Sequence, residues 1–519
     1  MSIRFQHTPV TALMVAIFAA IACFIIEGSM GFSLADEGFL WYGAQRTILG
    51  EVPIRDFTSY EPGRYYWLAL WGRILNDTGV GTMRLSVYAF WSIGVMSVLL
   101  IIDAREWKSQ WSRGLVWLSS ILTFFLWAHP RHKLFDISIS MCLTAILTWL
   151  LLKPAPKRFF IMGFCLGLTA FFGRNHALYG AVGLLLALLI SRKSLQTPPA
   201  RKTCFALTTG GFLGASPLLF LSIFVPGFFH AYLESILAVL RLGQTNLPLP
   251  IPWPWLLKSI DIFSFNSLRQ ISTSALFIAI LIIPLLKLLH LIISRNKIAH
   301  TDAPMIAATS LAIPYAHFAF SRADLSHLAQ AIHPTLVLSL LIAINYPRLK
   351  TFILCTIMSV SLVICLRAHP YFQCIPHSLC STITVSNQIL SVRKETAITI
   401  STLNDIYSKY GDDSRTFLVA PLWPGAYALF EKKAPVLWTY PLFAQTNEAQ
   451  QAEISRIQHA NPSFALIVDH ALNGIEQLRF RHTNPLIVAY LDDNYTRLKL
   501  PENPAFSLYI PKQLPPDES

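Results

Sequence analysis

Ionisable side chains are concentrated in residues 31–66, immediately after the first apolar run of the chain. Only 13% of the 519 residues are charged, yet this stretch contains Asp36, Glu37, Arg46, Glu51, Arg55, Asp56, Glu61 and Arg64. Ionisable groups are costly to hold at the edge of a low-dielectric phase, so such a concentration indicates either a functional site or structural ion pairs. Both interpretations are open at the level of the sequence.

The adjacent carboxylates Asp36 and Glu37 are the first candidates for chemistry. Of two neighbouring carboxylates, one can accept a proton from an incoming hydroxyl group while the other orients a partner or a cation. The segments that follow, WYGAQRTILGEVPIRDF and YEPGRYYWLALWGRIL, predict two short amphipathic helices joined by a Pro-containing turn. These helices would hold the acidic pair in place.

The composition is that of a polytopic membrane protein. Hydrophobic residues make up 54% of the chain and the mean hydropathy is +0.49, whereas charged residues are about 25% of a typical globular protein. The formal net charge is +13. From residue 381 onward there are 12 Lys and Arg against 14 Asp and Glu, so the positive excess lies in the apolar part of the chain. No folded basic face interleaved with aromatic residues is evident, so we expect no nucleic-acid partner.

Eleven apolar runs are long enough to suggest membrane-spanning helices. They lie near residues 9–27, 84–102, 114–128, 134–152, 159–173, 177–191, 203–225, 271–293, 304–320, 328–345 and 350–367. The first run is longer than the apolar core of a typical signal peptide, so we expect an uncleaved helix. The fold class predicted is therefore a polytopic α-helical membrane protein of about 11 spans.

Charges in alternate loops indicate how the protein is oriented. Loops that we assign to the cytoplasm are rich in Lys and Arg, as the positive-inside rule requires. Their basic residues are Arg105, Lys108, Arg113, Lys153, Lys157, Arg158, Arg192, Lys193, Arg201, Lys202, Arg295, Lys297, Arg348 and Lys350. With an odd number of spans, the N-terminus is predicted in the cytoplasm and residues 371–519 on the external side of the membrane.

The loops on the predicted external side mix His, Arg, Asp and Asn, which indicates a shared cavity there. They are HPRHK (129–133), GRNH (173–176) and SRADLSH (321–327). Arg322, Asp324 and His327 combine a cation, a carboxylate and an imidazole, which could form an ion pair with an oriented His or could simply cap a helix. The longer segment 226–270 is aromatic and rich in Pro, so we expect it to lie in the membrane interface.

The tail changes period and predicts a small α/β domain. Residues 383–410 predict a helix, 448–460 a second helix, and 464–469, 486–500 and 506–511 strands. We therefore predict two domains: residues 1–370, a transmembrane module with the external loop 31–83, and residues 371–519, an external α/β domain. This second domain shows no Gly-rich phosphate loop.

The stretch after the first span resembles the GT-C class of membrane glycosyltransferases. The resemblance rests on the acidic pair, on Tyr42, Ala44, Gly50, Pro53, Asp56 and Phe57, and on Pro62-Gly63-Arg64-Tyr65-Tyr66 before the second span. The nearest group is that of the protein O-mannosyltransferases and the lipid A aminoarabinose transferases. Tyr60-Glu61-Pro62-Gly63-Arg64 stands where that group more commonly has His-x-Pro-Pro-Gly.

The resemblance implies a GT-C fold and a reaction on the external, periplasmic face of a bacterial inner membrane. The donor would be a polyprenyl-phosphate-linked sugar, the acceptor a lipid, a glycan or a protein, and Asp36 the catalytic base with Glu37 beside it. The leaving phosphate needs fixed cations, for which the candidates are Arg131, His132, Lys133, Arg174, His176 and Arg322. The substrate cavity would be lined by Glu61, Arg64, Tyr65, Asn175, Asp324 and His327.

Metal binding and disulfide formation are open at this stage. Asp36, Glu37 and Asp324 are hard oxygen ligands, but they do not specify a divalent cation such as Mg²⁺ or Mn²⁺. Six of the eight cysteines lie in or at the ends of apolar runs, whereas Cys374 and Cys380 lie six residues apart in a Pro-containing loop. That spacing is compatible with a disulfide on an oxidising face.

Two other function classes fit parts of the sequence. A transporter or flippase of lipid-linked intermediates would be expected to carry Gly- or Pro-broken spans and charges near the midplane, whereas the charges here gather at one face. A non-enzymatic assembly protein of the cell envelope would present the α/β tail to a partner.

Overall fold

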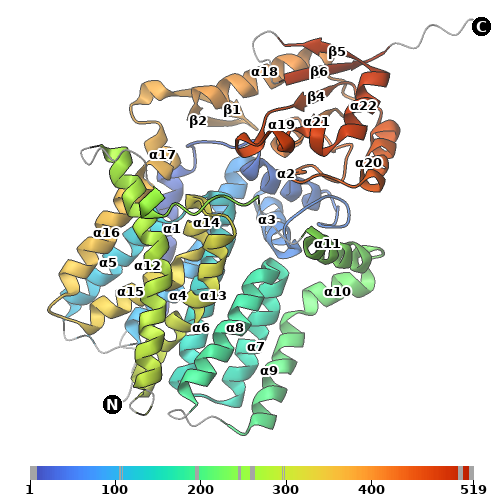
Figure 1. The fold of residues 1–519 in the computed structure, drawn as a ribbon. Coiled ribbons are helices and arrows are strands. Elements are labelled where there is room, and N and C mark those ends of the chain that lie inside the picture. The colour runs from blue at the N-terminus through green and yellow to red at the C-terminus, as the bar shows by residue number, and fades with distance from the viewer. Residues whose placement is uncertain are drawn as a thin grey trace, which may run out of the picture. The chain divides into compact units, whose positions relative to one another are not determined.

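A computed structural model describes residues 9–512 except 105, 106, 108, 193–197, 243–246, 257–263, 295, 297 and 501–505. Its contacts divide the chain into two compact units (Figure 1). The first, here the membrane unit, contains residues up to Gly28 and Arg84–Gln373. The second, here the α/β unit, contains Ser29–Met83 and residues from Cys374 onward. The chain therefore crosses between the units three times.

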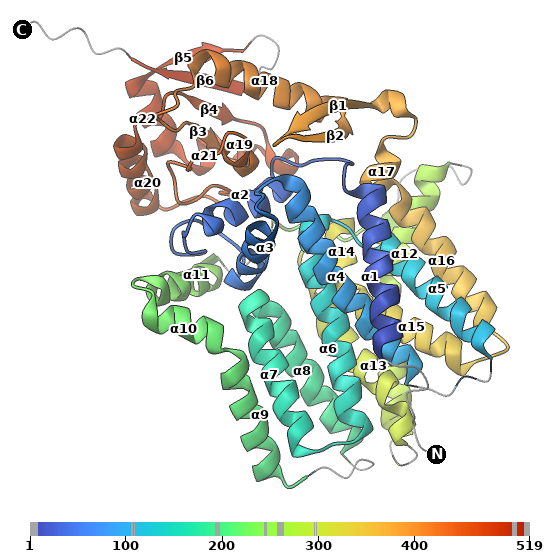
Figure 2. The ribbon, with the colours of Figure 1, turned by 180° about the vertical axis from the view of Figure 1, so that it is seen from behind.

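The described part of the membrane unit consists of helices and the loops that join them. Its helices are α1 (Pro9–Glu27), α4 (Val80–Asp103), α5 (Gln110–Leu126), η1 (Arg131–Lys133), α6 (Leu134–Leu152), α7 (Pro156–Phe172), α8 (Arg174–Ser191), α9 (Ala200–Gly214), α10 (Ser216–Phe224), α11 (Phe228–Leu242), η2 (Pro254–Leu256), α12 (Phe265–Ile293), η4 (His300–Asp302), α13 (Ala303–Ser321), α14 (Leu325–Ala331), α15 (His333–Asn345), α16 (Lys350–Cys365), η5 (Leu366–Ala368) and α17 (Pro370–Gln373). Figures 1 and 2 show α5 and α16 side by side from both directions. One buried apolar cluster of this unit joins α6, α7, α8 and α13 and includes Ala206 of α9 and Leu291 of α12.

All eleven predicted spans are helical, although not all are long enough to count as spans. Among the described residues, seven helices are long and apolar enough to cross a membrane, and nine if two bent pairs each count as one. The bent pairs are α9 with α10, at 54°, and α14 with α15, at 57°. The other two predicted spans are α5 and α7, each with 17 residues, close to the shortest length that spans a bilayer.

Glycines let α7 and α9 pack backbone against backbone. A Cβ atom at Gly210 would lie 2.0 Å from the carbonyl oxygen of Phe160, and one at Gly214 would lie 2.0 Å from that of Phe164. On the facing helix, a Cβ at Gly167 would lie 2.2 Å from the carbonyl oxygen of Gly211. This small-xxx-small spacing on both helices is the common solution for close helix pairs in membranes, where no hydrophobic effect drives association.

The α/β unit combines the segment after the first span with the tail. Its elements are α2 (Asp36–Ile48), α3 (Pro62–Leu75), α17's successor η6 (His377–Leu379), β1 (Cys380–Val385), β2 (Gln388–Arg393), α18 (Lys394–Tyr410), β3 (Leu418–Ala420), α19 (Pro424–Leu429), α20 (Asn447–Ala460), β4 (Ala465–Val468), η7 (Leu472–Gly474), η8 (Glu476–Leu478), α21 (Phe480–Thr483), α22 (Pro485–Asn494), β5 (Tyr495–Lys499) and β6 (Phe506–Pro511). One sheet has the order β3-β4-β6-β5, in which only β3 and β4 are parallel. A separate hairpin pairs β1 with β2.

Helix α2 is held against the tail by a contact between two glycines. A Cβ atom at Gly38 would lie 2.5 Å from the Cα of Gly425 in α19. The N–H of Gly425 donates to the carbonyl oxygen of Leu34 at 2.9 Å. A larger residue at either glycine would push α2 away from α19, so these two positions fix where Asp36 begins its helix.

Two secondary-structure predictions for the tail were wrong. The helix predicted over 383–410 begins only at Lys394, and the residues before it form the β1–β2 hairpin. Ser386 and Asn387 both have positive φ, 45° and 62°, as the two-residue turn of a tight hairpin requires. The strand predicted over 486–500 is α22 followed by β5, because Pro485 starts a helix that buries Ile487 and Leu491 on one face.

The division into units places residues 29–83 differently from the predicted domains. The predicted boundary after residue 370 lies close to the observed boundary after Gln373, but the segment 29–83 packs with the tail. In the segment 226–270, α11 and the stacked rings of Trp253 and Trp255 are described, and its interfacial position stays a prediction. The loop cations Arg105, Lys108, Lys193, Arg295 and Lys297 lie outside the described residues.

Candidate active site

Asp36 is presented at the start of α2 with an exposed carboxylate. Its backbone N–H donates to the hydroxyl of Ser33 at 3.2 Å, and a carboxylate in the first turn is stabilised by the helix dipole. The side-chain Oδ1 of Asp36 accepts a hydrogen bond from the hydroxyl of Tyr440 at 3.1 Å. An exposed carboxylate held in one orientation can act as a general base.

A series of aromatic ring contacts links Asp36 to Arg64, which the sequence analysis assigned to the substrate cavity. The ring of Phe39, one turn after Asp36, lies 5.7 Å from that of Tyr440 and 5.1 Å from that of Tyr60. The guanidinium of Arg64 lies 5.0 Å from the centre of the Tyr60 ring, a distance typical of a cation–π contact. The structure therefore brings Asp36 and Arg64 into one cluster of the α/β unit.

The other predicted residues of this region differ in their access to solvent. Glu37 is only 4% exposed, so the two adjacent carboxylates lie in different environments. Tyr65 is fully buried, and its hydroxyl accepts the N–H of Tyr60 at 3.1 Å. Burial raises the pKa of Tyr65 well above its usual range. Glu61 is half-buried at the start of α3. Tyr65 is therefore a residue of the interior, whereas the carboxylate of Asp36 is open to solvent.

The remaining charges after the first span form structural ion pairs. Arg46 donates twice to Glu51, at 2.6 and 3.1 Å, and Lys433 lies 2.8 Å from the same carboxylate. Burial would raise the pKa of Glu51, but these hydrogen bonds lower it overall. Arg55 donates to Asp56, whose Oδ2 also accepts the N–H of Val52 at 2.7 Å. The ion-pair interpretation is therefore the right one for these four residues of the stretch.

The residues that carry the family resemblance have a structural function. Gly50 has a φ of +95°, which favours glycine. The ring of Phe57 packs edge-on against Tyr42 at 6.0 Å and Tyr65 at 5.8 Å. Gly43 lets Tyr65 approach α2, since a Cβ there would lie 2.3 Å from the Tyr65 ring. The pattern therefore builds the turn between α2 and α3.

In the membrane unit, Arg322, Asp324 and His327 form the cluster that their spacing predicts. Arg322 Nε donates to Asp324 Oδ2 at 2.6 Å, and His327 contacts Asp324 Oδ1 through its backbone N–H and its Nδ1, both at 2.8 Å. Burial would raise the pKa of Asp324, but the hydrogen bonds from His327 and Arg322 lower it to about 2. Asp324 is also the N-cap of α14, so it both caps a helix and orients two basic side chains.

His176 is engaged by two buried partners. Its Nε2 lies 2.5 Å from Asp136 Oδ1, and its Nδ1 lies 2.8 Å from the hydroxyl of Tyr315. The imidazole is 3% exposed. Both ring nitrogens are thus used within the protein, so His176 braces α6, α8 and α13 and is a poor candidate for binding the donor phosphate.

The predicted phosphate ligands differ in their surroundings: those of the segment 131–133 are buried or half-buried, and Arg174 and Arg322 lie at helix ends. Arg131 donates to the carbonyl oxygen of Glu27 at 2.6 Å, and its neighbour His132 is buried, whereas Lys133 is half-buried. Arg174 donates to the hydroxyl of Ser235 in α11 at 3.0 Å. The neighbouring Asn175 is exposed. Arg131 is thus at least partly structural, while Arg174 and Arg322 occupy the ends of α8 and α13.

Two of the polar loops meet around one ring. The ring of Phe318 lies 6.1 Å from that of His176 and 5.6 Å from that of His327. The segments GRNH and SRADLSH therefore lie together in the membrane unit. Asp36, Glu37, Glu61, Arg64 and Tyr65 belong to the α/β unit.

Two features of the structure were missed in the sequence analysis. Tyr440 lies in an irregular segment, and nothing local marks it as a partner of Asp36. Glu27 and His369 form a buried pair at 2.5 Å. A signal for Glu27 was present, because it is a carboxylate at the end of the first apolar run, and such residues are rare in spans. Among the described residues, no group of three or more His, Cys, Asp or Glu side chains could hold a metal ion.

No family model and no curated protein matches this sequence. Solved structures do. ArnT from Cupriavidus metallidurans in the apo state aligns over 96% of this chain and 97% of its own, with 11% identity and a TM-score of 0.50. The chain has the GT-C fold. ArnT bound to undecaprenyl phosphate aligns over the same shares, with 12% identity and a TM-score of 0.49. The oligosaccharyltransferase AglB from Archaeoglobus fulgidus, in complex with an inhibitory peptide and a dolichol-phosphate, has 11% identity and a TM-score of 0.42 over 98% of this chain and 75% of its own.

The GT-C fold agrees with the observed organisation of the chain. Its neighbours are polytopic membrane proteins, and this chain combines apolar helices with a small mixed domain. A fold does not by itself assign a function, so the roles of individual residues have to be argued from their own surroundings.

Proposed function

We propose that this protein is an integral membrane glycosyltransferase that moves a sugar from a polyprenyl-phosphate-linked donor to a hydroxyl group of a lipid, glycan or protein acceptor. The observation that carries the proposal is Asp36, an exposed carboxylate at a helix N-terminus with its Oδ1 oriented by Tyr440. The GT-C fold makes glycosyl transfer the reaction class to test first.

The reaction would be a direct displacement with inversion at the anomeric carbon. Asp36 takes the proton of the acceptor hydroxyl as the oxygen forms its bond to the anomeric carbon. The bond from that carbon to the phosphate oxygen breaks, and the electron pair leaves on the polyprenyl phosphate. Because negative charge grows on the phosphate, fixed cations stabilise the transition state. Arg174 and Arg322 are the proposed cations, since each guanidinium is held by hydrogen bonds at the end of a helix.

The direct test is transfer by the purified full chain in nanodiscs. The probe is a set of undecaprenyl-phosphate-linked hexoses and pentoses, with released undecaprenyl phosphate measured by mass spectrometry. Removing a general base lowers such rates by about 100-fold or more, so we expect this loss in Asp36→Asn. The matched control is Asp405→Asn, an exposed carboxylate of α18 in the same unit. Full activity of Asp36→Asn would exclude the proposed base, and lipid movement without sugar release would favour a transporter.

The proposal places the reaction on the external side of a bacterial inner membrane. The Lys and Arg residues of alternate loops support a cytoplasmic N-terminus and an external α/β unit. A reporter enzyme that is active only outside the cytoplasm, fused after residue 519, would be active in this orientation. A silent fusion with normal expression would reverse the orientation and place the reaction in the cytoplasm.

A further inference from the structure

Three chain connections join the two units. The residues of the membrane unit at or near the ends of these connections form one buried cluster. The connections leave the membrane unit after Gly28, before Arg84 and after Gln373. The cluster contains Glu27, Arg84, Tyr88 and His369, which are between 0% and 1% exposed. It is called the anchor cluster below.

The carboxylate of Glu27 is the centre of the anchor cluster. Its Oε1 lies 2.5 Å from Nδ1 of His369, and its Oε2 accepts a hydrogen bond from the hydroxyl of Tyr88 at 3.1 Å. The last residue of α1 is thus linked to α4 and to the segment that precedes α17. The first and third connections are tied together by this pair.

The protonation of His369 follows from its other partner. Its Nε2 lies 2.8 Å from the carbonyl oxygen of Leu126, which can only accept, so Nε2 carries a hydrogen. The Glu27–His369 hydrogen bond then holds one further proton, either on Nδ1 or on the carboxyl group. Both arrangements keep the hydrogen bond, and a glutamine at position 27 could donate to Nδ1 in the same way.

Two arginines, Arg84 of the anchor cluster and the neighbouring Arg131, bind carbonyl groups at the end of α1. Arg131 donates to the carbonyl oxygen of Glu27 at 2.6 Å, and Arg84 donates to that of Gly28 at 2.7 Å. The last carbonyl groups of a helix have no partner within the helix, and cations near them are favoured by its dipole. Arg84 is the first residue after the second connection, so this connection is tied to the first one.

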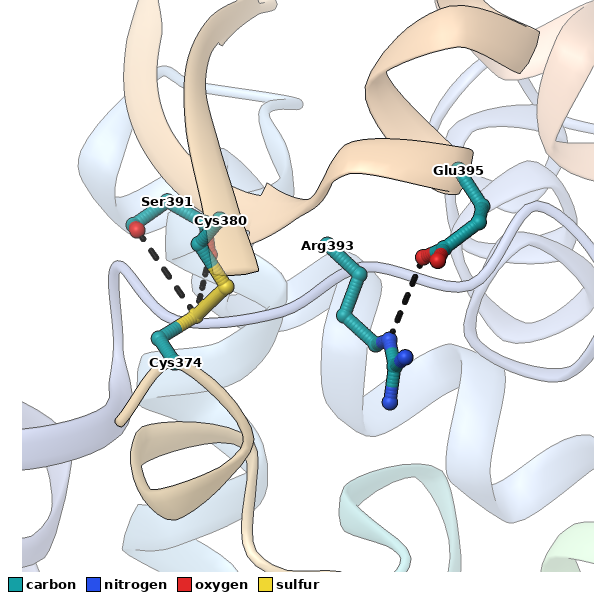
Figure 3. The surroundings of a disulfide bond; sticks show 5 residues. All are labelled: Cys374, Cys380, Ser391, Arg393 and Glu395. Atoms are coloured by element: carbon teal, nitrogen blue, oxygen red, sulfur yellow. Dashed lines mark hydrogen bonds and ion pairs between the residues drawn. A yellow bond between two sulfur atoms is a disulfide. The ribbon is translucent and has the colours of Figure 1, made fainter. Parts of the chain in front are cut away.

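The other ends of the same connections meet at the β1–β2 hairpin of the α/β unit. The N–H of Gly31 donates to the carbonyl oxygen of Ser391 at 2.7 Å, and the N–H of Ser391 donates to that of Ser29 at 2.8 Å. Cys374 forms a disulfide with Cys380 beside Ser391, as Figure 3 shows. A Cβ atom at Gly81 would lie 2.3 Å from the side chain of Gln388.

We propose that Glu27, Arg84 and His369 are positioning residues for the transfer reaction. They hold the membrane-unit ends of all three connections together, so that the segment carrying Asp36 has a fixed starting point. The inference rests on the proposed function of Asp36. The physical argument concerns free energy. Burying ionisable groups at the end of an apolar helix is unfavourable, and apolar side chains could take their place if only stability were needed. Here Arg84 binds the carbonyl oxygen of Gly28, the last residue before the first crossing, and Glu27 binds His369 in the segment that leads to the third.

The test compares Glu27→Gln with Glu27→Leu in the full chain in nanodiscs. Glutamine keeps hydrogen bonds to His369 and Tyr88, whereas leucine removes both. We expect Glu27→Leu to lower the rate constant for undecaprenyl phosphate release about 10- to 100-fold with little change in donor KM, because misplacement by about 1 Å has effects of this size. We expect Glu27→Gln to retain most of the rate.

Amide hydrogen exchange supplies a readout that does not need activity. Glu27→Leu should speed exchange in residues 24–31, 84–90 and 366–373, and Glu27→Gln should restore the original protection. Arg84→Met, which keeps the aliphatic stem, is the second variant if Glu27→Leu does not fold. It should speed exchange in residues 24–31 and 84–90.

The outcomes separate this inference from the proposed function. Asp36→Asn should abolish release while leaving exchange at the three connections unchanged. If the wild type releases no undecaprenyl phosphate but the exchange pattern follows the prediction, the anchor stands as a structural joint and the assigned reaction is wrong. Unchanged exchange and rate in Glu27→Leu would overturn the inference, as would a Glu27→Gln variant as impaired as Glu27→Leu.

Discussion

Asp36 and Glu37 show how neighbouring carboxylates can have different functions. The first is exposed and accepts a hydrogen bond from Tyr440, and the second is buried. On a helix, adjacent side chains point about 100° apart, so they rarely meet the same partners. The acidic pair is better described as one exposed candidate for the site and one residue of the interior.

Tyr440→Phe tests the orientation of Asp36. The substitution removes the hydroxyl that donates to Oδ1 and leaves the ring against Phe39. A hydrogen bond to a charged group contributes about 1.5 kcal/mol, so we expect the rate of undecaprenyl phosphate release to fall about tenfold, with the unfolding midpoint unchanged. The control is Tyr410→Phe at the end of α18. An unchanged rate in Tyr440→Phe would mean that Asp36 does not depend on this contact.

Asp324 gives a prediction for stability as a function of pH. Its folded pKa of about 2 lies below the ordinary value of 3.8, so the carboxylate contributes stability above about pH 4 and loses it as the pH falls toward 2. The shift corresponds to about 2 kcal/mol at most. Asp324→Asn retains a side chain that can cap α14 but removes the charge. We expect the difference in thermal midpoint between wild type and variant to shrink between pH 4 and 2; a constant difference would contradict the assignment.

At the scale of elements, apolar runs were the most reliable signal. Each predicted span is helical because a long apolar segment has to satisfy its backbone internally. The pattern of apolar residues did not distinguish helix from strand in short segments of the tail. The hairpin was missed because residues 383–393 were assigned to the helix that follows them, although Ile383 and Val385 have the alternating spacing of a strand and the turn residues Ser386 and Asn387 have positive φ. In α22, a β-branched pair suggested a strand although Pro485 starts a helix.

The α7–α9 contact yields a prediction from two adjacent glycines. Gly210→Ala places a Cβ 2.0 Å from the carbonyl oxygen of Phe160, whereas at Gly211 the nearest atom is 3.8 Å away. Overpacking of this kind costs about 1 to 3 kcal/mol. We expect Gly210→Ala to lower the thermal midpoint in detergent clearly and Gly211→Ala to leave it nearly unchanged. Equal effects would show that helix propensity, and not the contact, controls stability here.

At the scale of the whole molecule, the sequence predicts two domains but not which segments build them. Residues 29–83 pack with a tail that begins more than 290 residues later, and the hydrogen bond between Asp36 and Tyr440 joins positions 404 residues apart. Such contacts leave no periodic pattern in a single sequence. The charge pattern did identify Asp36, Arg322 and Asp324 as residues with defined partners, whereas the anchor cluster could be recognised only once its members were seen together.

The Cys374–Cys380 disulfide lies at the third connection, where its contribution can be measured. It closes a loop with a sequence separation of 6, and the loop-entropy relation gives about 2 kcal/mol for a loop of this length. We expect the double variant Cys374→Ser/Cys380→Ser to lower the thermal midpoint and to speed exchange of the Ser391 and Gly31 amides, whose hydrogen bonds join residues 29–31 to β2. A reductant should reproduce both effects in the wild type and add nothing in the double variant. Cys204→Ser, at an exposed free cysteine of α9, is the control. If the reductant shifts the double variant as strongly as the wild type, another thiol is responsible and the disulfide does not stabilise this connection.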